Sequence, residues 1–327
     1  MRAAVITEPG GPDVLKIIEV DDPVPGPEDV LIDVKASALN RADMIQRQGN
    51  YPAPAGSPSD IPGLEFAGVV LEAGERVAGM AKGDRVFGLL GGGGYASRTI
   101  THHRMAVRIP DAWDFVQAAA TPEVFFTAYD ALFNRGNLQM GERVLVHAAG
   151  SGVGTAAVQL AHHAGAFVFG TAGSAEKLAG AATLGMDVGI NYHDQDFAEI
   201  IKEHTSGVGV DVLIDFIGAP YWNKNIASMA VLGRLVEVGL MGGSKVEVEL
   251  GQLMGKRLQV TGTGLRGRSL EEKLAVTAQF KRHVLPHLAS GSMKPVVDRS
   301  FPLEEVADAH RYMETNANFG KIILTID

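Results

Sequence analysis

The pattern of apolar and polar residues changes near residue 121. Before that point, short apolar runs are separated by proline and glycine, and they predict strands at residues 3–7, 15–20, 30–36, 66–72 and 85–89. Residues 40–48 predict a short helix. Residues 49–62, which contain Pro52, Pro54, Pro58 and Pro62, predict a loop that forms the wall of a site. The first third of the chain is therefore expected to be an irregular, β-rich domain.

From about residue 121, apolar runs of strand length alternate with helical patterns. The six expected strands are residues 143–147, 167–171, 188–191, 210–215, 234–238 and 258–262. Such alternation predicts an α/β fold with a doubly wound parallel sheet of the Rossmann type.

After about residue 265 the alternation stops. We expect a helix at residues 270–288, a strand near 296–297, a helix at 303–314 and a closing strand at 321–326. This tail is expected to fold back onto the first domain. The predicted domains are thus residues 1–122 with 266–327, and residues 123–265.

Composition narrows the classes of function. The chain has 327 residues and a net charge of -9, without a cluster of Lys and Arg, which disfavours nucleic acid or an anionic membrane as partner. Cysteine is absent, which excludes disulfides, thiolate zinc ligands and a cysteine nucleophile. The first apolar run ends by Thr7, too short for a signal peptide, so a cytoplasmic protein is expected. The uncharged residues 144–175 are as long as a membrane span, but their glycines and histidines favour a buried strand, helix and strand.

A small-residue turn stands between the first expected strand of the second domain and the helix after it. The sequence VLVHAAGSGVG at residues 144–154 allows close approach of a pyrophosphate, which the helix N-terminus stabilises. Ser151, Gly152, Val153 and Gly154 are therefore candidate cofactor contacts. The turn departs from the G-x-G-x-x-G pattern, so a plain strand-to-helix turn remains an alternative. A serine hydrolase elbow is disfavoured, because it requires glycine at residues 149 and 153.

The end of the next strand distinguishes NADPH from NADH. Gly173 stands where an NAD site usually has a carboxylate, Ser174 offers a hydroxyl, and Lys177 follows one helical turn later. Tyr192, after the third strand, can add another hydroxyl. These residues favour NADPH, although each taken alone is also compatible with plain surface. Glu176 either reaches a ribose or complements the helix dipole.

Several segments carry a family resemblance: SALNRADMIQRQG, GLEFAGVV, SGVGTAAVQL, TAGSAEKL, GLMGG and NFGKI. They resemble the medium-chain dehydrogenase/reductase superfamily and, within it, the zinc-free NADPH quinone oxidoreductases. The resemblance implies a GroES-like substrate domain joined to a Rossmann domain that binds NADPH. It also implies a homodimer and a quinone or other electrophilic small molecule as acceptor.

The resemblance bears on metal binding as well. Zinc-containing relatives have a cysteine ligand where this chain has Asn40 and a histidine ligand where it has Leu64, so no metal site is expected. The adjacent pairs His102–His103 and His162–His163 do not by themselves form a closed site. Without a metal, an ordinary ketone loses Lewis-acid assistance. A quinone needs less assistance because its reduced oxyanion is delocalised, and an activated enone, which gives an enolate, is also admitted.

The resemblance also assigns residues near the reaction. It places Asn40 and Tyr51 close to nicotinamide and substrate, with Tyr51 either a proton donor to the acceptor oxygen or an apolar wall. Asp43 either orients local backbone or Arg41, or lies on a helix surface. The remaining cofactor neighbours that it implies are Thr127, Ser151, Gly152, Val153, Gly239, Leu240, Met241, Leu265 and Asn318.

Three functions remain open from the sequence. The first is an NADPH-dependent quinone reductase that works without zinc. The second is an NADPH-dependent reductase of activated carbon–carbon double bonds on the same scaffold. The third is a protein that binds NADPH without catalysis, although the acidic charge counts against RNA as its partner.

Overall fold

The computed structural model describes all 327 residues, which divide into two compact units. Unit 1 comprises Met1–Glu123 and Leu265–Asp327, and unit 2 comprises Val124–Gly264. Glu123 and Leu265, which the sequence analysis assigned to the Rossmann domain, belong to unit 1. For Glu123 the reason is a hydrogen bond, because its backbone N–H donates to Oε2 of Glu65 in the sheet of unit 1 at 2.8 Å.

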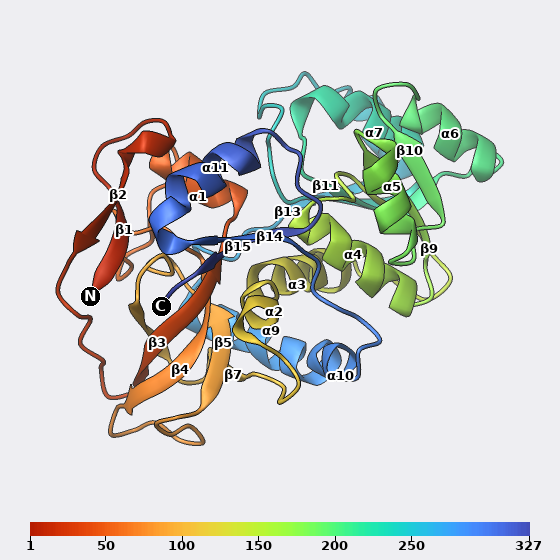
Figure 1. Cartoon of the computed structure of the whole chain (residues 1–327). Helices are drawn as coiled ribbons and strands as arrows, with labels where there is room; N and C mark the ends of the chain where they lie inside the picture. The colour runs from red at the N-terminus through yellow and green to blue at the C-terminus, as the bar shows by residue number, and fades with distance from the viewer. The chain divides into compact units, whose positions relative to one another are not determined.

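Unit 1 is built on a seven-stranded sheet in the order β14-β15-β3-β4-β5-β7, with β6 pairing with β3 off this path. Figure 1 shows β3, β4 and β5 side by side. Burial alternates along β3, so that Val30, Ile32 and Val34 join the core of this unit. The strands of unit 1 are β1 (Arg2–Ile6), β2 (Leu15–Glu19), β3 (Asp29–Ala38), β4 (Glu65–Ala73), β5 (Arg85–Leu89), β6 (Arg98–His102), β7 (Val107–Arg108), β14 (Val297–Pro302) and β15 (Lys321–Thr325).

The C-terminal segment completes this sheet. β15 pairs antiparallel with β3, where Ile323 lies opposite Ala38, and β14 pairs parallel with β15. The helix expected at residues 270–288 ends as α9 at His283 and resumes as α10, whose first turn contains Pro286. Proline has no N–H to donate and disfavours helical backbone before it, which explains the break. The helices of unit 1 are α1 (Arg41–Arg47), α2 (Phe115–Ala119), α9 (Leu270–His283), α10 (Leu285–Ala289) and α11 (Val306–Glu314), with short 3-10 turns η1 (Pro12–Val14) and η4 (Leu303–Glu305).

Unit 2 contains a six-stranded parallel sheet in the order β10-β9-β8-β11-β12-β13, which confirms the predicted doubly wound α/β fold. The strand order reverses between β8 and β11, the position at which such sheets bind ligands beyond their carboxyl ends. Its strands are β8 (Arg143–Val146), β9 (Phe167–Ala172), β10 (Val188–Asn191), β11 (Val210–Asp215), β12 (Met229–Glu237) and β13 (Gln259–Gly262). Its helices are α4 (Gly152–His163), α5 (Ala175–Ala182), α6 (Phe197–His204), α7 (Trp222–Ser228) and α8 (Leu250–Lys256), with the 3-10 turn η3 (Ala219–Tyr221). Helix α3 (Pro122–Tyr129) spans the unit boundary and continues as the π-helical η2 (Asp130–Arg135).

Strand β12 begins earlier than the sequence predicts. Its register against β11 shifts between the pair Val210–Met229 and the pair Val212–Arg234. Within this irregular part, Leu232 has a φ of 66°. Val231 and Leu232 are exposed, so the buried apolar pattern that identifies the strand starts only near Arg234.

A buried polar network joins three strands of unit 2 near their carboxyl ends. His147 lies 2.9 Å from Oγ1 of Thr171 through Nδ1 and 2.8 Å from Oδ1 of Asn225 through Nε2. The Asn225 amide donates to Oδ2 of Asp215 at 2.8 Å. Burial lowers the pKa of His147, although the nearby carboxylate of Asp215 opposes that shift.

The uncharged residues 144–175 fold as the end of β8, helix α4 and strand β9, as expected. None of the helices combines the length and the apolar character that crossing a membrane requires.

Candidate functional site

The turn between β8 and α4 in unit 2 has the form of a phosphate-binding turn. Ser151 is the N-cap of α4, and its Oγ accepts a hydrogen bond from the N–H of Gly154 at 3.0 Å. Ala148 takes a positive φ of 49°, which turns the chain sharply before the helix. Other N–H groups of the first turn have no partner within the helix, so the sequence-predicted residues Ser151, Gly152 and Val153 lie where a helix attracts an anion.

The two glycines of this turn differ in what surrounds them. A Cβ on Gly154 would lie 2.1 Å from the carbonyl oxygen of Ala148, so the packing of α4 against its own turn requires glycine there. A Cβ on Gly150 would lie 3.1 Å from Cβ and Cδ of Lys177. The side chain of Lys177, on α5, therefore lies against the phosphate-binding turn.

The end of β9 extends this group of residues. Ser174 is the N-cap of α5, and its Oγ accepts from the N–H of Lys177 at 3.3 Å. A Cβ on Gly173 would lie 2.5 Å from Oη of Tyr192 and 3.1 Å from Nε2 of His193. Unit 2 thus brings Gly150, Gly173, Ser174, Lys177 and Tyr192 to one end of its sheet. It also adds His193, which the sequence analysis did not select although it follows Tyr192 directly.

Glu176 is fully exposed in the first turn of α5. Hydrogen bonding by its own backbone N–H and by the Ser174 hydroxyl lowers the pKa of Glu176. These contacts are those of a carboxylate that complements a helix N-terminus.

The remaining expected contacts in unit 2 lie on α3 and after β12. Thr127 is buried on α3. Gly239 donates its N–H to the carbonyl of Asp215 at 3.3 Å, and Met241 donates to the carbonyl of Phe216 at 3.1 Å. Segment 239–241 therefore crosses the carboxyl end of β11, with the side chains of Leu240 and Met241 about half exposed.

In unit 1, Asn40 belongs to a buried charged cluster. The ammonium of Lys321 donates to Oδ1 of Asn40, to the carbonyl of Leu39 and to Oε1 of Glu65, each at 2.7 Å. The amide of Asn40 donates to the same Oε1 of Glu65 at 2.9 Å. Lys321 and Glu65 are 3% and 0% exposed, and all three N–H groups of the ammonium have acceptors. Lys321 was not among the predicted site residues, because its only sequence signal is a lysine at the start of an apolar closing strand.

Asp43 orients local backbone, one of the roles that the sequence left open. Its carboxylate accepts from the N–H of Asn40 at 2.8 Å, from the N–H of Gly63 at 3.1 Å and from the hydroxyl of Tyr95 at 3.0 Å. Burial, only partly offset by these bonds, raises the pKa of Asp43 to about 6. Arg41 turns elsewhere and donates to the carbonyl of Met313 at 3.2 Å.

Tyr51 packs against an arginine, Arg266. The guanidinium of Arg266 lies 4.9 Å from the centre of the Tyr51 ring. The same guanidinium donates to the carbonyl of Gly91 at 2.8 Å and to Oε1 of Gln46 at 2.6 Å, which holds it in place. Burial, and then the negative charge of Glu123, raise the pKa of Tyr51 above its ordinary value of 10.0.

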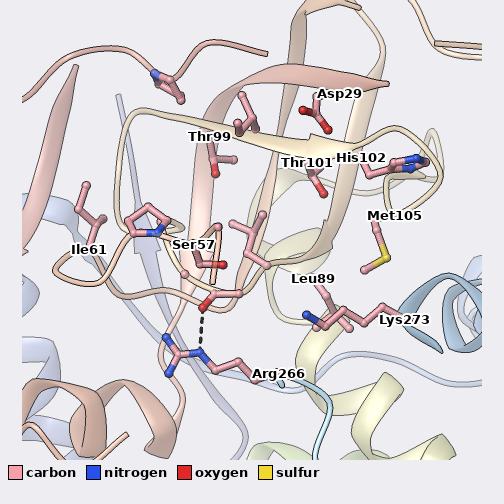
Figure 2. A pocket seen from close by; sticks show the side chains of 18 of the residues that line it. Asp29, Ser57, Ile61, Leu89, Thr99, Thr101, His102, Met105, Arg266 and Lys273 are labelled. Carbon is pink, nitrogen blue, oxygen red and sulfur yellow. Dashed lines mark hydrogen bonds between the residues drawn. The ribbon is translucent and has the colours of Figure 1, made fainter. Parts of the chain in front are cut away.

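Unit 1 contains a cavity of about 490 Å³. Figure 2 shows Arg266 and Lys273 along one side and Thr99, Thr101 and Asp29 along the other. Pockets of this volume hold small organic ligands, with a few polar groups in a mainly apolar lining. The apolar side chains of the lining include Ile61, Leu89, Leu90, Met105, Leu265 and Leu270.

Glu123 also lines this cavity, and the sequence analysis missed it. Burial and then the negative charge of Glu65 raise the pKa of Glu123 to about 8, whereas the positive charges of Lys321 and Arg266 oppose the shift. The carboxyl group forms no hydrogen bond within the protein, since the only bond of this residue to Glu65 uses its backbone N–H. In sequence, Glu123 resembles any acidic residue in the first turn of a helix.

Two residues expected near the cofactor lie in unit 1. Leu265 is buried and lines the cavity. Asn318 is also buried, and its amide donates to the carbonyl of Gly320 at 2.8 Å, which stabilises the turn before β15.

Potential metal ligands are not grouped. No cluster of three or more His, Asp, Glu or Cys side chains is arranged to hold a metal ion. The rings of His102 and His103 stack with centres 4.9 Å apart, and those of His162 and His163 lie 6.0 Å apart.

Comparison with known proteins gives the following similarities. The family described as "Alcohol dehydrogenase GroES-like domain" matches residues 26–111, and "Zinc-binding dehydrogenase" matches residues 152–279, which confirms the expected pairing of a GroES-like with a Rossmann-type domain. Human quinone oxidoreductase is 32% identical over 100% of this chain and 98% of its own. The structure of Escherichia coli quinone oxidoreductase complexed with NADPH superposes with a TM-score of 0.90, at 32% identity and covering 99% of this chain and 100% of that one. The CurK enoyl reductase structure gives 0.89, at 31% identity, over 100% and 99% of the two chains.

Proposed function

We propose, from the premise that this chain belongs to the quinone oxidoreductase family of medium-chain dehydrogenases/reductases, that it transfers hydride from NADPH to a quinone. The observation that carries the proposal is the cavity of unit 1, which combines an apolar lining with Glu123, Arg266 and Lys273. An apolar wall suits a planar ring, and the few polar groups suit its oxygens.

The residues of unit 2 fit NADPH. The turn at residues 148–154 would hold the pyrophosphate at the N-terminus of α4. Ser174, Lys177 and Tyr192 would hold the 2′-phosphate, and no carboxylate takes the place of Gly173 to select a ribose hydroxyl. Thr127 and residues 239–241 would contact other parts of the cofactor. When bound, NADPH supplies the hydride.

The residues of unit 1 do not fit a catalytic zinc ion, although one of the matching families is described as zinc-binding. The ammonium of Lys321 already lies against Asn40 and Glu65, and its positive charge would repel a second cation. Leu64 offers no ligand atom, and the chain has no thiol. The proposed reaction therefore proceeds without a metal.

A quinone suits this metal-free site. Its reduced oxyanion is delocalised over an aromatic ring, so hydrogen bonding and positioning suffice for its stabilisation. We assign Asn40 to the positioning of nicotinamide and acceptor, with its amide held by Lys321 and Glu65. We assign Tyr51 to the wall of the acceptor site, since Arg266 packs on its ring.

The second candidate is the reduction of activated carbon–carbon double bonds. The similarity to an enoyl reductase of nearly identical length favours it. Its chemistry needs the same cofactor and the same cavity, but its product is an enolate, which is more basic than a reduced quinone. It therefore depends more strongly on an acid in the site.

The proposal includes a homodimer formed through unit 2. β13 is an edge strand of the sheet, and it exposes Val260. Nearby in sequence, Leu250 and Met254 of α8 are also exposed. An edge strand has unpaired backbone groups and is ready to pair with a second strand, and sedimentation velocity of the purified protein tests the dimer directly.

The deciding experiment follows the absorbance of NADPH and of NADH with chelator-treated protein. The acceptors are ortho-quinones, para-quinones, enones and simple aldehydes. Oxidation of NADPH by quinones, with aldehydes left untouched, is the expected result. Turnover of enones alone would replace the quinone with the second candidate, and no turnover with any acceptor would favour a protein that binds NADPH without catalysis.

A further inference from the structure

We propose that Glu123 is the acid that delivers a proton to the acceptor oxygen in the cavity of unit 1. This inference rests on the proposed function and adds the step that completes the reduction. It assigns to Glu123 the proton for which the family resemblance had offered Tyr51 as a donor.

The geometry gives Glu123 a fixed backbone and an unengaged carboxyl group. Its N–H is bonded to Oε2 of Glu65, while Oε1 of Glu65 is held by Lys321 and Asn40. The carboxyl group of Glu123 lines the cavity and has no hydrogen-bond partner within the protein. Because this carboxyl group lines the cavity and has no partner from the protein, it is available to hydrogen-bond a molecule bound there.

The surrounding charges keep this carboxyl group neutral. Burial first, and then the negative charges of Glu65 and Asp43, raise the pKa of Glu123 to about 8, while Lys321 and Arg266 oppose the shift. At pH 7 the group therefore carries the proton that a general acid needs. Tyr51 is the weaker acid, because its pKa is raised above an ordinary value of 10.0.

The reaction balances with this acid. The acceptor gains a hydride with its two electrons, its carbonyl π bond or conjugated system is reduced, and one oxygen carries the negative charge. The O–H bond of Glu123 then breaks as a new O–H bond forms on the acceptor. A hydroquinone oxygen is a phenol, with a pKa of about 10 by analogy with tyrosine, so transfer from Glu123 is favourable. Water reprotonates the Glu123 carboxylate after the product leaves.

Two cations, Arg266 and Lys273, line the same cavity, and Lys273 is the alternative proton donor. Arg266 stays protonated and supplies positive charge for the developing oxyanion. Lys273 carries protons as well, and burial lowers its pKa from the ordinary value of 10.5. A test of Glu123 must therefore separate it from Lys273.

The test compares Glu123→Gln with the wild type, because glutamine keeps the shape and removes the acidic proton. With an enone acceptor we expect kcat to fall about 100-fold or more, while the Kd for NADPH stays the same. A smaller fall is expected with a quinone, whose anion is less basic. Glu123→Asp should recover part of the rate. Glu72→Gln is the matched control, since Glu72 is exposed on β4.

The pH profile gives the decisive readout. In the wild type, kcat should fall as the pH rises through about 8, and this limb should vanish in Glu123→Gln. A variant with the rate and the pH profile of the wild type would overturn the role of Glu123 and leave the proposed function intact. A limb that survives in Glu123→Gln and disappears in Lys273→Met would overturn it in favour of Lys273.

A measurement without cofactor or turnover adds an independent check. The infrared difference spectrum between the wild type and Glu123→Gln should contain the band of a protonated carboxylic acid at pH 6, and this band should fade as the pH rises through about 8. Absence of the band at pH 6 would sink the assignment. If the wild type itself reduces no acceptor, the proposed function fails and the role of Glu123 fails with it.

Discussion

The ammonium nitrogen of Lys321 lies 2.7 Å from Oε1 of Glu65, and both side chains are buried. Removal of the cation would leave a buried carboxylate without its counter-charge. We expect Lys321→Met to lower the free energy of unfolding by about 3–5 kcal/mol, as measured by denaturant titration at pH 7. The matched control is Lys35→Met, which breaks a pair with Asp33 whose side chains are 35% and 34% exposed, and it should cost at most about 1 kcal/mol. Similar losses for both variants would contradict this view of the cluster.

Lys177→Ala should weaken the binding of NADPH far more than the binding of NADH. A hydrogen bond to a charged group contributes about 1.5–3 kcal/mol, so the Kd for NADPH should rise by about 10- to 100-fold, with little change for NADH. Fluorescence titration of the two cofactors measures both values. Lys202→Ala, which removes an exposed lysine on α6, is the control. Equal losses for NADPH and NADH would refute the 2′-phosphate contact.

The two glycines of the phosphate-binding turn should respond differently to alanine. Gly154→Ala places a methyl group against the backbone of Ala148, and we expect a loss of about 3 kcal/mol in thermal or chemical unfolding. Gly150→Ala meets the flexible side chain of Lys177, so the fold should tolerate it. Displacement of Lys177 should nevertheless weaken the binding of NADPH. A Gly154→Ala protein as stable as the wild type would contradict the packing argument.

Stability should depend on pH through Glu123. Its pKa in the folded protein is about 8 against an ordinary value of 4.5, so between these values the folded state binds more protons than the unfolded state. The contribution of this group is therefore fully favourable below about pH 4.5 and is lost as the pH rises through 8. Glu123→Gln should remove this dependence and be more stable than the wild type by about 2–5 kcal/mol at pH 8.5. If the stability of the two proteins changed with pH in the same way from pH 5 to 9, this prediction would be contradicted.

The Tyr51→Phe variant tests whether Tyr51 donates a proton or only forms part of the wall of the acceptor site. Loss of a general acid costs about 100- to 10,000-fold in rate, whereas loss of a hydroxyl from a wall costs little. Because Arg266 packs on the ring and not on the hydroxyl, we expect kcat to stay within about threefold of the wild type. Tyr51→Ala, which removes the ring, should raise KM for the acceptor. A drop of 100-fold for Tyr51→Phe would return the proton to this residue.

The Rossmann sheet could be predicted from sequence because strands buried on both faces are continuous apolar runs. β6 escaped the same reasoning since its inward-facing residues are Thr99 and Thr101, which are buried but not apolar. The break between α9 and α10 follows from Pro286, a signal that was present in the sequence but was outweighed by the helical pattern around it.

The residues of the candidate site also fall into two groups, those that a local sequence pattern predicts and those that only the fold brings together. The phosphate-binding turn is contiguous, so Ser151 and Gly154 could be selected from spacing alone. Lys321 and Glu65 are 256 positions apart, and they meet only because β15 and β4 both pair with β3. Glu123 could not be recognised either, because its raised pKa depends on burial and on the charge of Glu65, neither of which a local pattern contains.

In the buried network at the carboxyl ends of β8, β9 and β11, the donor and the acceptor of each hydrogen bond can be assigned. Asp215 can only accept, so the amide of Asn225 points its NH₂ group toward Asp215 and its oxygen toward His147. The imidazole must then carry its proton on Nε2, which leaves Nδ1 to accept from the hydroxyl of Thr171. A second proton on His147 would remove the only acceptor for that hydroxyl. The burial that lowers the pKa of His147 keeps the ring neutral, and the single tautomer that Asn225 then imposes sets the polarity of the whole chain of donors next to the phosphate-binding turn.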